Sequence, residues 1–296
     1  MKPTCPYCGS SKIARRGSLP RQRYQCTDKN HPDGVSRYFY GEKSMVDILV
    51  FDIETLPGKK YFWRLGDQDW NIESIIADPC VLSFAAKWLF RPGHYSAILT
   101  PKEAATRDDR RVVQGMRNLM EKAQIVIAHN GEKFDAPMLN GRYLLHDMTP
   151  PSPYRMIDTL LTSRKVFNLP SNKLDYLAQY LGVGRKRHTD YELWKRCDQG
   201  DKGALKEMIT YNQQDVYILE DVYVKLRPWI KHPNLSMYIN TDKDVHVCGH
   251  CTSDDIDWIG EYYTDASVFE SFRCNNCGAV GRHFKREKTS LVRVVR

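Results

Sequence analysis

The sequence predicts an α/β fold with a small metal-binding unit near each end of the chain. Apolar runs of strand length alternate with segments of helical periodicity through the middle of the chain. Cysteine pairs separated by two residues occur toward both ends, and this spacing is typical of structural zinc sites. The 296 residues, 42% of them hydrophobic, suffice for one large domain with small appendages.

Residues 1–44 are expected to form the first of these units, a zinc ribbon. Cys5 and Cys8 make a knuckle, and Cys26 follows without a second cysteine two residues later. A segment this short buries little core, so bound metal would supply its folding energy. The predicted zinc ligands are Cys5, Cys8, Cys26 and His31, with Asp28 or Asp33 as alternatives to His31.

An apolar, β-branched run from Val46 to Thr55 predicts a buried strand that ends in carboxylates. Because side chains alternate along a strand, Asp52 and Glu54 project from the same face. Two neighbouring carboxylates repel each other, and a hard divalent cation between them relieves that repulsion. The other interpretation is a strand end with two solvated acids.

The following chain alternates between strands and helices. Residues 59–79 are too long for a hairpin turn and are expected either to cover a substrate or to pack on the core. A basic loop at 184–188 is expected either to face a bound strand or to be solvated. The expected strands are residues 81–89, 95–99 and 125–128, and the expected helices are residues 108–122, 134–145, 174–182 and 204–226.

Further acids occur at the borders of these elements. Asp135 follows the strand at 125–128 and stands near a helix start. Tyr211 and Asp215 are four residues apart in a helical pattern, so they share one helix face. Asp158 follows another apolar stretch, and we expect it to have a structural role.

Residues 241–296 are expected to form a second zinc ribbon. Two complete knuckles enclose alternating aromatic and polar residues, which makes this a strong zinc signal. The basic tail that follows predicts either an arm that contacts polyanions or a solubilising segment. The predicted zinc ligands are Cys248, Cys251, Cys274 and Cys277.

Three motifs together resemble the DEDD family of 3′–5′ exonucleases. Phe51 to Thr55 resembles the first motif, Asn130 to Asp135 the second, and Tyr211 to Asp215 the third. Thr210 stands where the histidine branch of the family has its histidine, so the resemblance is to the tyrosine branch, DEDDy. It covers roughly residues 45–231 and is similar to the proofreading domains of family B DNA polymerases. The amino-terminal ribbon resembles those of insertion-sequence transposases.

The resemblance implies a ribonuclease-H-like fold, a mixed sheet flanked by helices, over residues 45–240. It also implies two-metal hydrolysis of phosphodiester bonds at a 3′ end, releasing nucleoside monophosphates. Four carboxylates would hold two Mg²⁺ or Mn²⁺ ions, a phenol would orient water, and three residues would contact terminal nucleotides. The metal ligands are Asp52, Glu54, Asp135 and Asp215, the phenol is Tyr211, and the nucleotide contacts are Thr55, Asn130 and Phe134.

The formal net charge of +8 favours a polyanionic partner. We expect single-stranded nucleic acid, with DNA favoured and RNA open, and a polymerase or other replication or processing protein if the chain acts in trans. No apolar run approaches the ~20 residues that span a membrane. The paired cysteines and the absence of a signal-peptide core predict the reducing cytoplasm of a prokaryotic or virus-infected cell.

Other functions compete with this interpretation. The chain could be a zinc-ribbon adaptor that binds nucleic acid through an inactive nuclease core. It could also be an RNA-specific exonuclease. A protein of transposition is suggested only by the first ribbon, and no transposase acid triad is evident.

Overall fold

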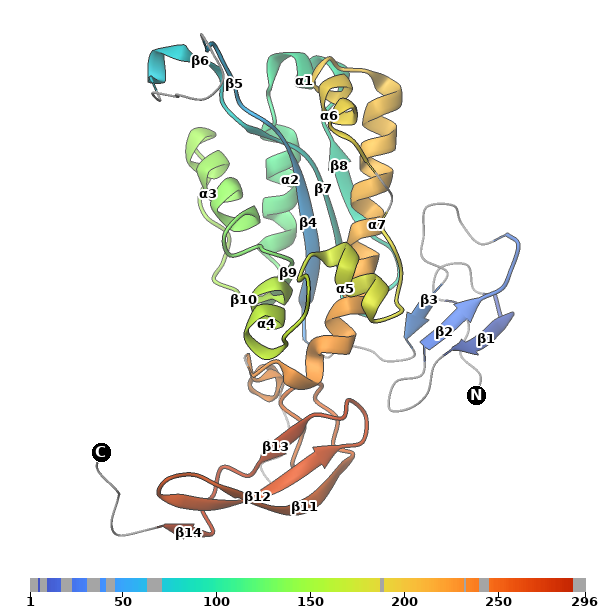
Figure 1. Ribbon diagram of the computed structural model, residues 1–296, viewed down its shortest axis with the longest axis vertical. Helices are drawn as coiled ribbons and strands as arrows, with labels where there is room; N and C mark the ends of the chain where they lie inside the picture. Colours follow the sequence, from blue (N-terminus) through green and yellow to red (C-terminus); the bar gives the residue numbers. More distant parts are fainter. Residues whose placement is uncertain are drawn as a thin grey trace.

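The structure, a computed structural model, describes residues 5, 10–16, 23–30, 38–40, 46–62, 71–186, 189–231, 233–239 and 245–289. A small amino-terminal sheet, a large central sheet and a carboxy-terminal sheet follow one another along the chain (Figure 1). The first sheet is antiparallel in the order β1-β2-β3. Its strands are β1 (Ile13–Arg16), β2 (Arg23–Cys26) and β3 (Tyr38–Tyr40).

The central sheet has five strands in the order β10-β9-β4-β7-β8. β10, β9 and β4 run parallel, whereas β7 is antiparallel to both β4 and β8. The predicted mixed sheet is therefore confirmed. Its strands are β4 (Ile48–Leu56), β7 (Cys80–Trp88), β8 (Tyr95–Ile98), β9 (Ile125–Ala128) and β10 (Arg155–Asp158).

Helices cover both faces of this sheet (Figure 1). Leu49, Phe51 and Ile53 of β4 pack in a core with residues of α2 and α3, and also with the start of α7. Ile48 and Val50 point to the opposite side and pack with residues of α5 and the later part of α7. The helices are α1 (Pro101–Thr106), α2 (Arg110–Met120), α3 (Asp135–Leu145), α4 (Thr159–Val166), α5 (Leu174–Tyr180), α6 (Tyr191–Asp198) and α7 (Lys202–Leu226).

The longest helix, α7, has 25 residues and contains neither proline nor an interior glycine beyond its first turn. Asp201 caps it by accepting a hydrogen bond from the amide of Ala204 at 2.6 Å. The helix lies against β4, β7 and β8, so its side chains reach the middle of the sheet. This contact lets residues of α7 meet residues of β4.

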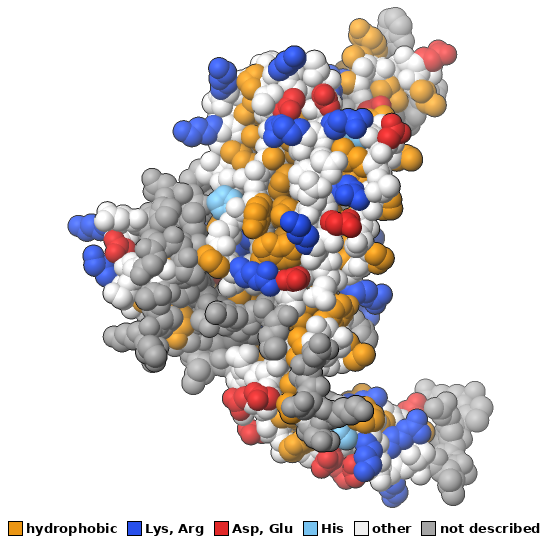
Figure 2. Space-filling model, turned by 180° about the vertical axis from the view of Figure 1, so that it is seen from behind, with side chains coloured by type: hydrophobic (Ala, Val, Ile, Leu, Met, Phe, Trp, Pro, Cys, Tyr) orange, Lys and Arg blue, Asp and Glu red, His pale blue; other side chains and the backbone are white. Residues whose placement is uncertain are grey.

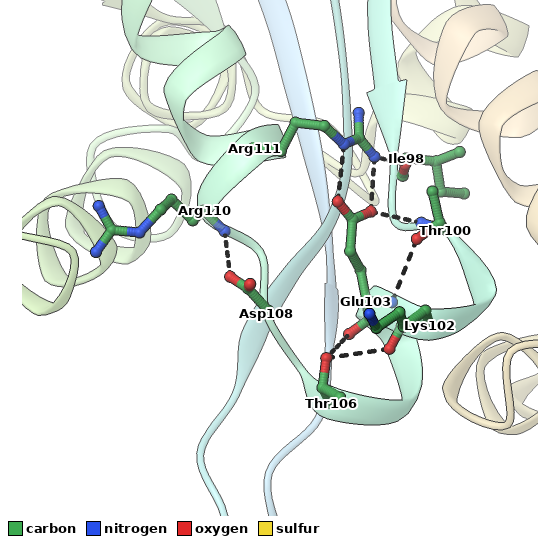
Figure 3. Close-up of polar contacts among 8 residues, drawn as sticks. All are labelled: Ile98, Thr100, Lys102, Glu103, Thr106, Asp108, Arg110 and Arg111. Carbon is green, nitrogen blue, oxygen red and sulfur yellow. Dashed lines mark hydrogen bonds and ion pairs between the residues drawn. The ribbon is translucent and has the colours of Figure 1, made fainter.

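A hydrogen-bonded corner joins β8 to α1 and α2 (Figure 3). Thr100 accepts a hydrogen bond from the amide of Glu103 at 3.2 Å, and Glu103 accepts one from the amide of Thr100 at 2.7 Å. Arg111 donates to both oxygens of Glu103, each at 2.8 Å. These hydrogen bonds, those from Arg111 foremost, lower the pKa of Glu103 to about 2.

Several short elements are not among those that the sequence predicts. Residues 59–79 contain a hairpin of β5 (Lys59–Lys60) and β6 (Ile75–Ala77), with the 3-10 helix η1 (Ile72–Ser74) between them. Tyr61 is 76% exposed in this hairpin, so that part of it does not pack on the core. Helix α6 lies in a stretch for which the sequence predicts neither a helix nor a strand, and Asp190 caps it.

The carboxy-terminal sheet is fixed to the end of α7. Arg227 donates a hydrogen bond to the carbonyl of His250, and His250 Nδ1 lies 3.1 Å from the carbonyl oxygen of Arg227. Leu235 donates to the carbonyl of Gly249 at 2.7 Å. The connecting 3-10 helices are η2 (Arg227–Trp229) and η3 (Leu235–Tyr238), and the strands are β11 (Ile256–Tyr263), β12 (Ser267–Cys274), β13 (Val280–Arg282) and β14 (Lys288–Thr289).

Strand β12 pairs with each of the other three strands of this sheet, always antiparallel. This four-stranded sheet lies within the stretch for which the sequence predicts a second zinc ribbon. Across the residues that the structure describes, no helix combines the length and the apolar character needed to cross a membrane.

Candidate active site

Three carboxylates from distant parts of the chain meet at the centre of the sheet. Oxygen atoms of Asp52, Glu54 and Asp215 all lie within 4.8 Å of one another. Asp52 and Glu54 point from the side of β4 that faces α7, and Asp215 comes from α7 itself. The geometry thus brings together three of the four acids that the sequence motifs singled out.

The fourth acid, Asp135, lies beside this cluster. It is the first residue of α3 and is 2% exposed. Its Oδ1 accepts a hydrogen bond from the amide of Ile53 at 3.1 Å. Since Ile53 stands between Asp52 and Glu54, this bond holds the start of α3 against the acidic segment of β4.

Asn212 fixes the orientation of Asp52, and sequence reasoning missed it. It is fully buried and donates a hydrogen bond from Nδ2 to Asp52 Oδ2 at 2.7 Å. Its own Oδ1 accepts a hydrogen bond from Ser83 of β7 at 3.1 Å. A chain of hydrogen bonds from β7 through α7 therefore holds the carboxylate in place. The signal that could have indicated it is an asparagine inside the third motif, directly after Tyr211.

Lys186 reaches the cluster from the loop after α5. Its Nζ lies 2.6 Å from Asp215 Oδ2 and donates a hydrogen bond to the hydroxyl of Tyr211 at 3.2 Å. The phenol of Tyr211 and the carboxylate of Asp215 are therefore neighbours. The sequence predicts a basic loop that either faces a bound strand or is solvated. The structure places one lysine of this loop among the acids. Arg187 and His188 lie outside the described residues.

The carboxyl groups of the site are shifted toward their protonated forms. Burial, followed by the charge of Asp215, raises the pKa of Glu54 to about 8, and burial raises that of Asp135 to about 7. Burial and then Glu54 raise the pKa of Asp52, and burial raises that of Asp215 despite Lys186. Burial alone would lower the pKa of Lys186, but the surrounding acids raise it.

These acids fit a hard divalent cation. When ionised, these four carboxylates carry more negative charge than the single ammonium of Lys186 neutralises. Asp215 Oδ1 is buried and has no hydrogen-bond donor in the described part of the chain. Oxygen ligands this close together, with an unused lone pair, are the chemistry that Mg²⁺ and Mn²⁺ accept.

Asp158 lies outside the cluster and shapes the turn of the second motif. Its Oδ1 accepts hydrogen bonds from the amides of Asn130 and Leu160, and its Oδ2 accepts one from Glu132. Asn130 has a positive φ of 75°, and a Cβ at Gly131 would lie 2.4 Å from that of Ala128. Asp158 thus has the structural role expected of it.

The three residues expected to contact nucleotides lie near the acids along the chain. Thr55 follows a bulge that shifts the β4–β7 register after Glu54. Phe134 precedes Asp135 and is 41% exposed, so its ring is open to a ligand. The contacts of these three residues with terminal nucleotides stay predictions.

The four cysteines of the carboxy-terminal ribbon also meet. Sulfur atoms of Cys248 and Cys277 lie 3.6 Å apart, and those of Cys251 and Cys274 lie 3.5 Å apart. These distances are too long for disulfides. They are close to the roughly 3.8 Å between sulfurs that a tetrahedral Zn²⁺ with 2.3 Å bonds produces. The cluster therefore fits one zinc ion.

The amino-terminal ligand set is described only in part. Cys5 and Cys26 are both buried. Cys8, His31 and Asp33 lie outside the described residues. Asp28 accepts hydrogen bonds from the hydroxyl of Ser10 and from the amide of Asn30, and the fourth ligand stays a prediction.

Residues 91–227 match the family model of the RNase H superfamily. The mixed sheet with helices on both faces has the RNase H-like fold that this match indicates. The match includes Asp135 and Asp215, whereas Asp52 and Glu54 lie before it. An RNase H-like core with clustered carboxylates is typical of nucleases, which act on nucleic acid.

The family B DNA polymerase of the hyperthermophilic archaeon Pyrobaculum calidifontis has a similar structure, with 19% sequence identity and a TM-score of 0.48. The likeness covers 73% of this chain and 28% of the polymerase, so the chain spans less than a third of the polymerase. A comparison with curated proteins finds none that matches.

The raised pKa values of the acids predict how pH affects the metal-free RNase H-like core. Unfolded carboxyls titrate near about 4. With Glu54 at about 8 and Asp135 at about 7, the folded protein keeps protons that the unfolded chain has released. The unfolding free energy therefore falls as pH rises from about 5 to about 8. Mg²⁺ should restore stability most at pH 8, where it binds ionised carboxylates.

Thermal unfolding of the metal-free protein across this range checks the prediction, with Asp52→Asn as the control. Burial lowers the pKa of His129 to about 4, so this residue makes the unfolding free energy rise with pH. Both proteins contain His129, so its effect cancels in the comparison. A wild-type pH slope that Asp52→Asn shares unchanged would contradict the prediction.

Proposed function

We propose that the protein is a metal-dependent 3′–5′ exonuclease of the DEDDy type that digests single-stranded nucleic acid, with DNA favoured, to nucleoside monophosphates. The observation that carries the proposal is the meeting of Asp52, Glu54 and Asp215, with Asp135 beside them and Tyr211 next to Asp215. The proposed division is residues 1–44, 45–240 and 241–296, with a zinc ribbon on either side of the nuclease. The enzyme acts alone or as a subunit in trans with a replication or processing protein, in a reducing cytoplasm.

Asp52, Glu54, Asp135 and Asp215 are the proposed ligands of two Mg²⁺ or Mn²⁺ ions. When bound, such ions lower the pKa of water and stabilise the charge that develops on the phosphate and the leaving oxygen. Asn212 keeps the Asp52 carboxylate oriented, and the bond to Ile53 keeps Asp135 beside it. The protein thereby holds its ligands in one arrangement before substrate binds.

Tyr211 is proposed to orient the attacking water. Its hydroxyl shares the ammonium of Lys186 with Asp215, so it lies where water beside the acids would be held. Burial raises the pKa of Tyr211 to about 12, so the phenol stays protonated and can donate a hydrogen bond. Thr55, Asn130 and Phe134 are proposed to contact the terminal nucleotides.

Digestion of matched single-stranded DNA and RNA tests the proposal. Purified protein with Mg²⁺ or Mn²⁺ should release mononucleotides, and a chelator should stop the release. Faster digestion of DNA agrees with the stated preference, and digestion of RNA alone would overturn that preference. If neither polymer is digested but both are bound, the chain is an adaptor with an inactive core.

Replacing Tyr211 by Phe should slow hydrolysis about 100-fold, because water loses its hydrogen-bonded orientation. Substrate affinity should change little, since the ring remains. Single-turnover rates and binding constants measure the two effects separately. Tyr217→Phe is a matched control, because this phenol lies on the same helix but contacts His94, 3.1 Å away. A loss of affinity as large as the loss of rate would show that Tyr211 holds the substrate instead.

A further inference from the structure

The carboxy-terminal sheet has two faces of different chemistry. Side chains alternate along β12, so Phe269 and Phe272 lie on opposite faces. Phe272 packs against the cysteine cluster and against Trp258, with ring centroids 5.8 Å apart. We call this side the inner face. The outer face carries Phe269 and, directly opposite it on β11, Tyr262.

On the outer face an arginine is stacked on aromatic rings. The guanidinium carbon of Arg282 lies 3.6 Å from the ring centroid of Phe269 and 5.5 Å from that of Tyr262. Phe269 is only 6% exposed, whereas Tyr262 is 48% exposed and Arg282 is exposed. The guanidinium is therefore supported from below by the phenyl ring and remains accessible beside an accessible phenol.

The surface next to these groups is free of side chains at Gly260. This residue lies at the bulge of β11 with φ of 125°, opposite Ser271 of β12. A Cβ added there would meet no atom within 4 Å. The strand position that precedes Tyr262 on this face therefore carries no side chain.

Charge separates between the two faces. Glu261 and Glu270 lie opposite each other on the inner face. Arg282 makes no ion pair in the part of the chain that the structure describes. On the outer face an acid, Asp257, lies at the far end opposite Arg273.

The turn after β13 adds further positive charge. Its basic residues are exposed and form no ion pair within the described ranges, and Figure 2 shows basic side chains close together on this ribbon, with acidic ones beside them. These residues are Lys285 and Arg286, and the acid Glu287 follows them.

We propose that this outer face binds single-stranded nucleic acid, with Tyr262 and Arg282 stacking on bases and the basic turn contacting phosphates. Unpaired bases offer flat faces to aromatic and guanidinium groups, and their backbone offers negative charge to lysine and arginine. A purely apolar partner would leave the unpaired cations without a role. A polyanion with flat rings uses both features.

The outer face is a separate site from the carboxylates. The ribbon is fixed at Arg227, which follows Asp215 by 12 residues at the end of α7. At the rise of a helix this corresponds to about 18 Å. This step rests on the proposed exonuclease function. One strand can contact both the carboxylates and the outer face only when it is long enough to span the distance between them.

Fluorescence anisotropy with a labelled 20-residue oligothymidylate tests the proposal on the full-length protein, without added divalent cations. Tyr262→Ala and Arg282→Ala should each raise Kd about five- to a hundredfold, the effect of losing one stacking partner. Arg282→Lys should give an intermediate Kd, because lysine keeps the positive charge but lacks the planar guanidinium that stacks on a base. Tyr263→Ala, an exposed tyrosine of the inner face, is the matched control and should change Kd less than about twofold.

Zinc content and thermal unfolding show whether each variant keeps its fold. Unchanged Kd for both outer-face variants, or an equal loss for Tyr263→Ala, would overturn the proposal. Because binding is read without cleavage, the two proposals fail separately. A protein that digests nucleic acid while Tyr262→Ala binds normally refutes only the outer-face site, and the reverse result refutes only the nuclease.

Discussion

Asp52→Asn should lower the rate of nucleic acid hydrolysis by about 10³-fold or more. The change removes a charged oxygen from the centre of the carboxylate cluster, and metal-assisted stabilisation of several kcal/mol depends on that charge. The variant should fold, because Asn212 can still donate to the remaining oxygen at this position. The metal-free variant should unfold at an equal or higher temperature, since one repelling charge is gone.

Asp47→Asn is a matched control for this experiment. Asp47 precedes β4 in the same strand segment, but its carboxylate is half-exposed and pairs with Arg91 at the opposite end from the cluster. Its loss should leave the rate of hydrolysis within about twofold, as for most surface changes. If Asp52→Asn and the wild type hydrolyse nucleic acid at equal rates, and a chelator stops both, Asp52 has no part in the reaction.

Cys274→Ser should release one zinc ion per chain and unfold the carboxy-terminal sheet. Structural zinc sites need four closed ligands, and binding energy of this kind is folding energy for a small ribbon. Cys274 ends β12, the strand on which the other three strands pair, so its loss should loosen the whole sheet. Elemental analysis and limited proteolysis of residues 245–289 measure both effects.

We expect two zinc ions in the wild type and one in Cys274→Ser. His31→Ala should also retain one, because it removes the proposed fourth ligand of the amino-terminal set. Cys197→Ser is the control, since this buried cysteine belongs to the core and should not affect zinc. A wild-type protein with one zinc that His31→Ala leaves unchanged would refute the amino-terminal site.

Long elements of the core could be predicted from the sequence. The run from Val46 to Thr55 contains all of β4 (Ile48–Leu56) except its last residue, and the helix expected over residues 204–226 is α7, which begins two residues earlier. Both have apolar patterns that extend over many residues, so local periodicity determines their type. The resemblance to the exonuclease motifs implies a site of four acids, and three of them, Asp52, Glu54 and Asp215, lie within 4.8 Å of one another.

The supporting contacts of the site could not be predicted. Whether Asn212 reaches Asp52, and whether Lys186 reaches Asp215, depends on how α7 and the loop after α5 pack on β4. Sequence spacing within one helix says nothing about this packing. The hairpin of β5 and β6 was missed for a related reason, because two short strands carry little periodicity.

The direction of digestion is the most direct test of the proposed 3′–5′ exonuclease activity. A single-stranded oligonucleotide with a 5′ label is incubated with Mg²⁺ and the wild-type protein, with its 3′ hydroxyl either free or chemically blocked. We expect a ladder that shortens one nucleotide at a time from the free 3′ end, no shortening of the blocked strand, and no ladder with Asp52→Asn. Equal digestion of the blocked strand by the wild type, or release of the 5′-terminal nucleotide first, would contradict this activity.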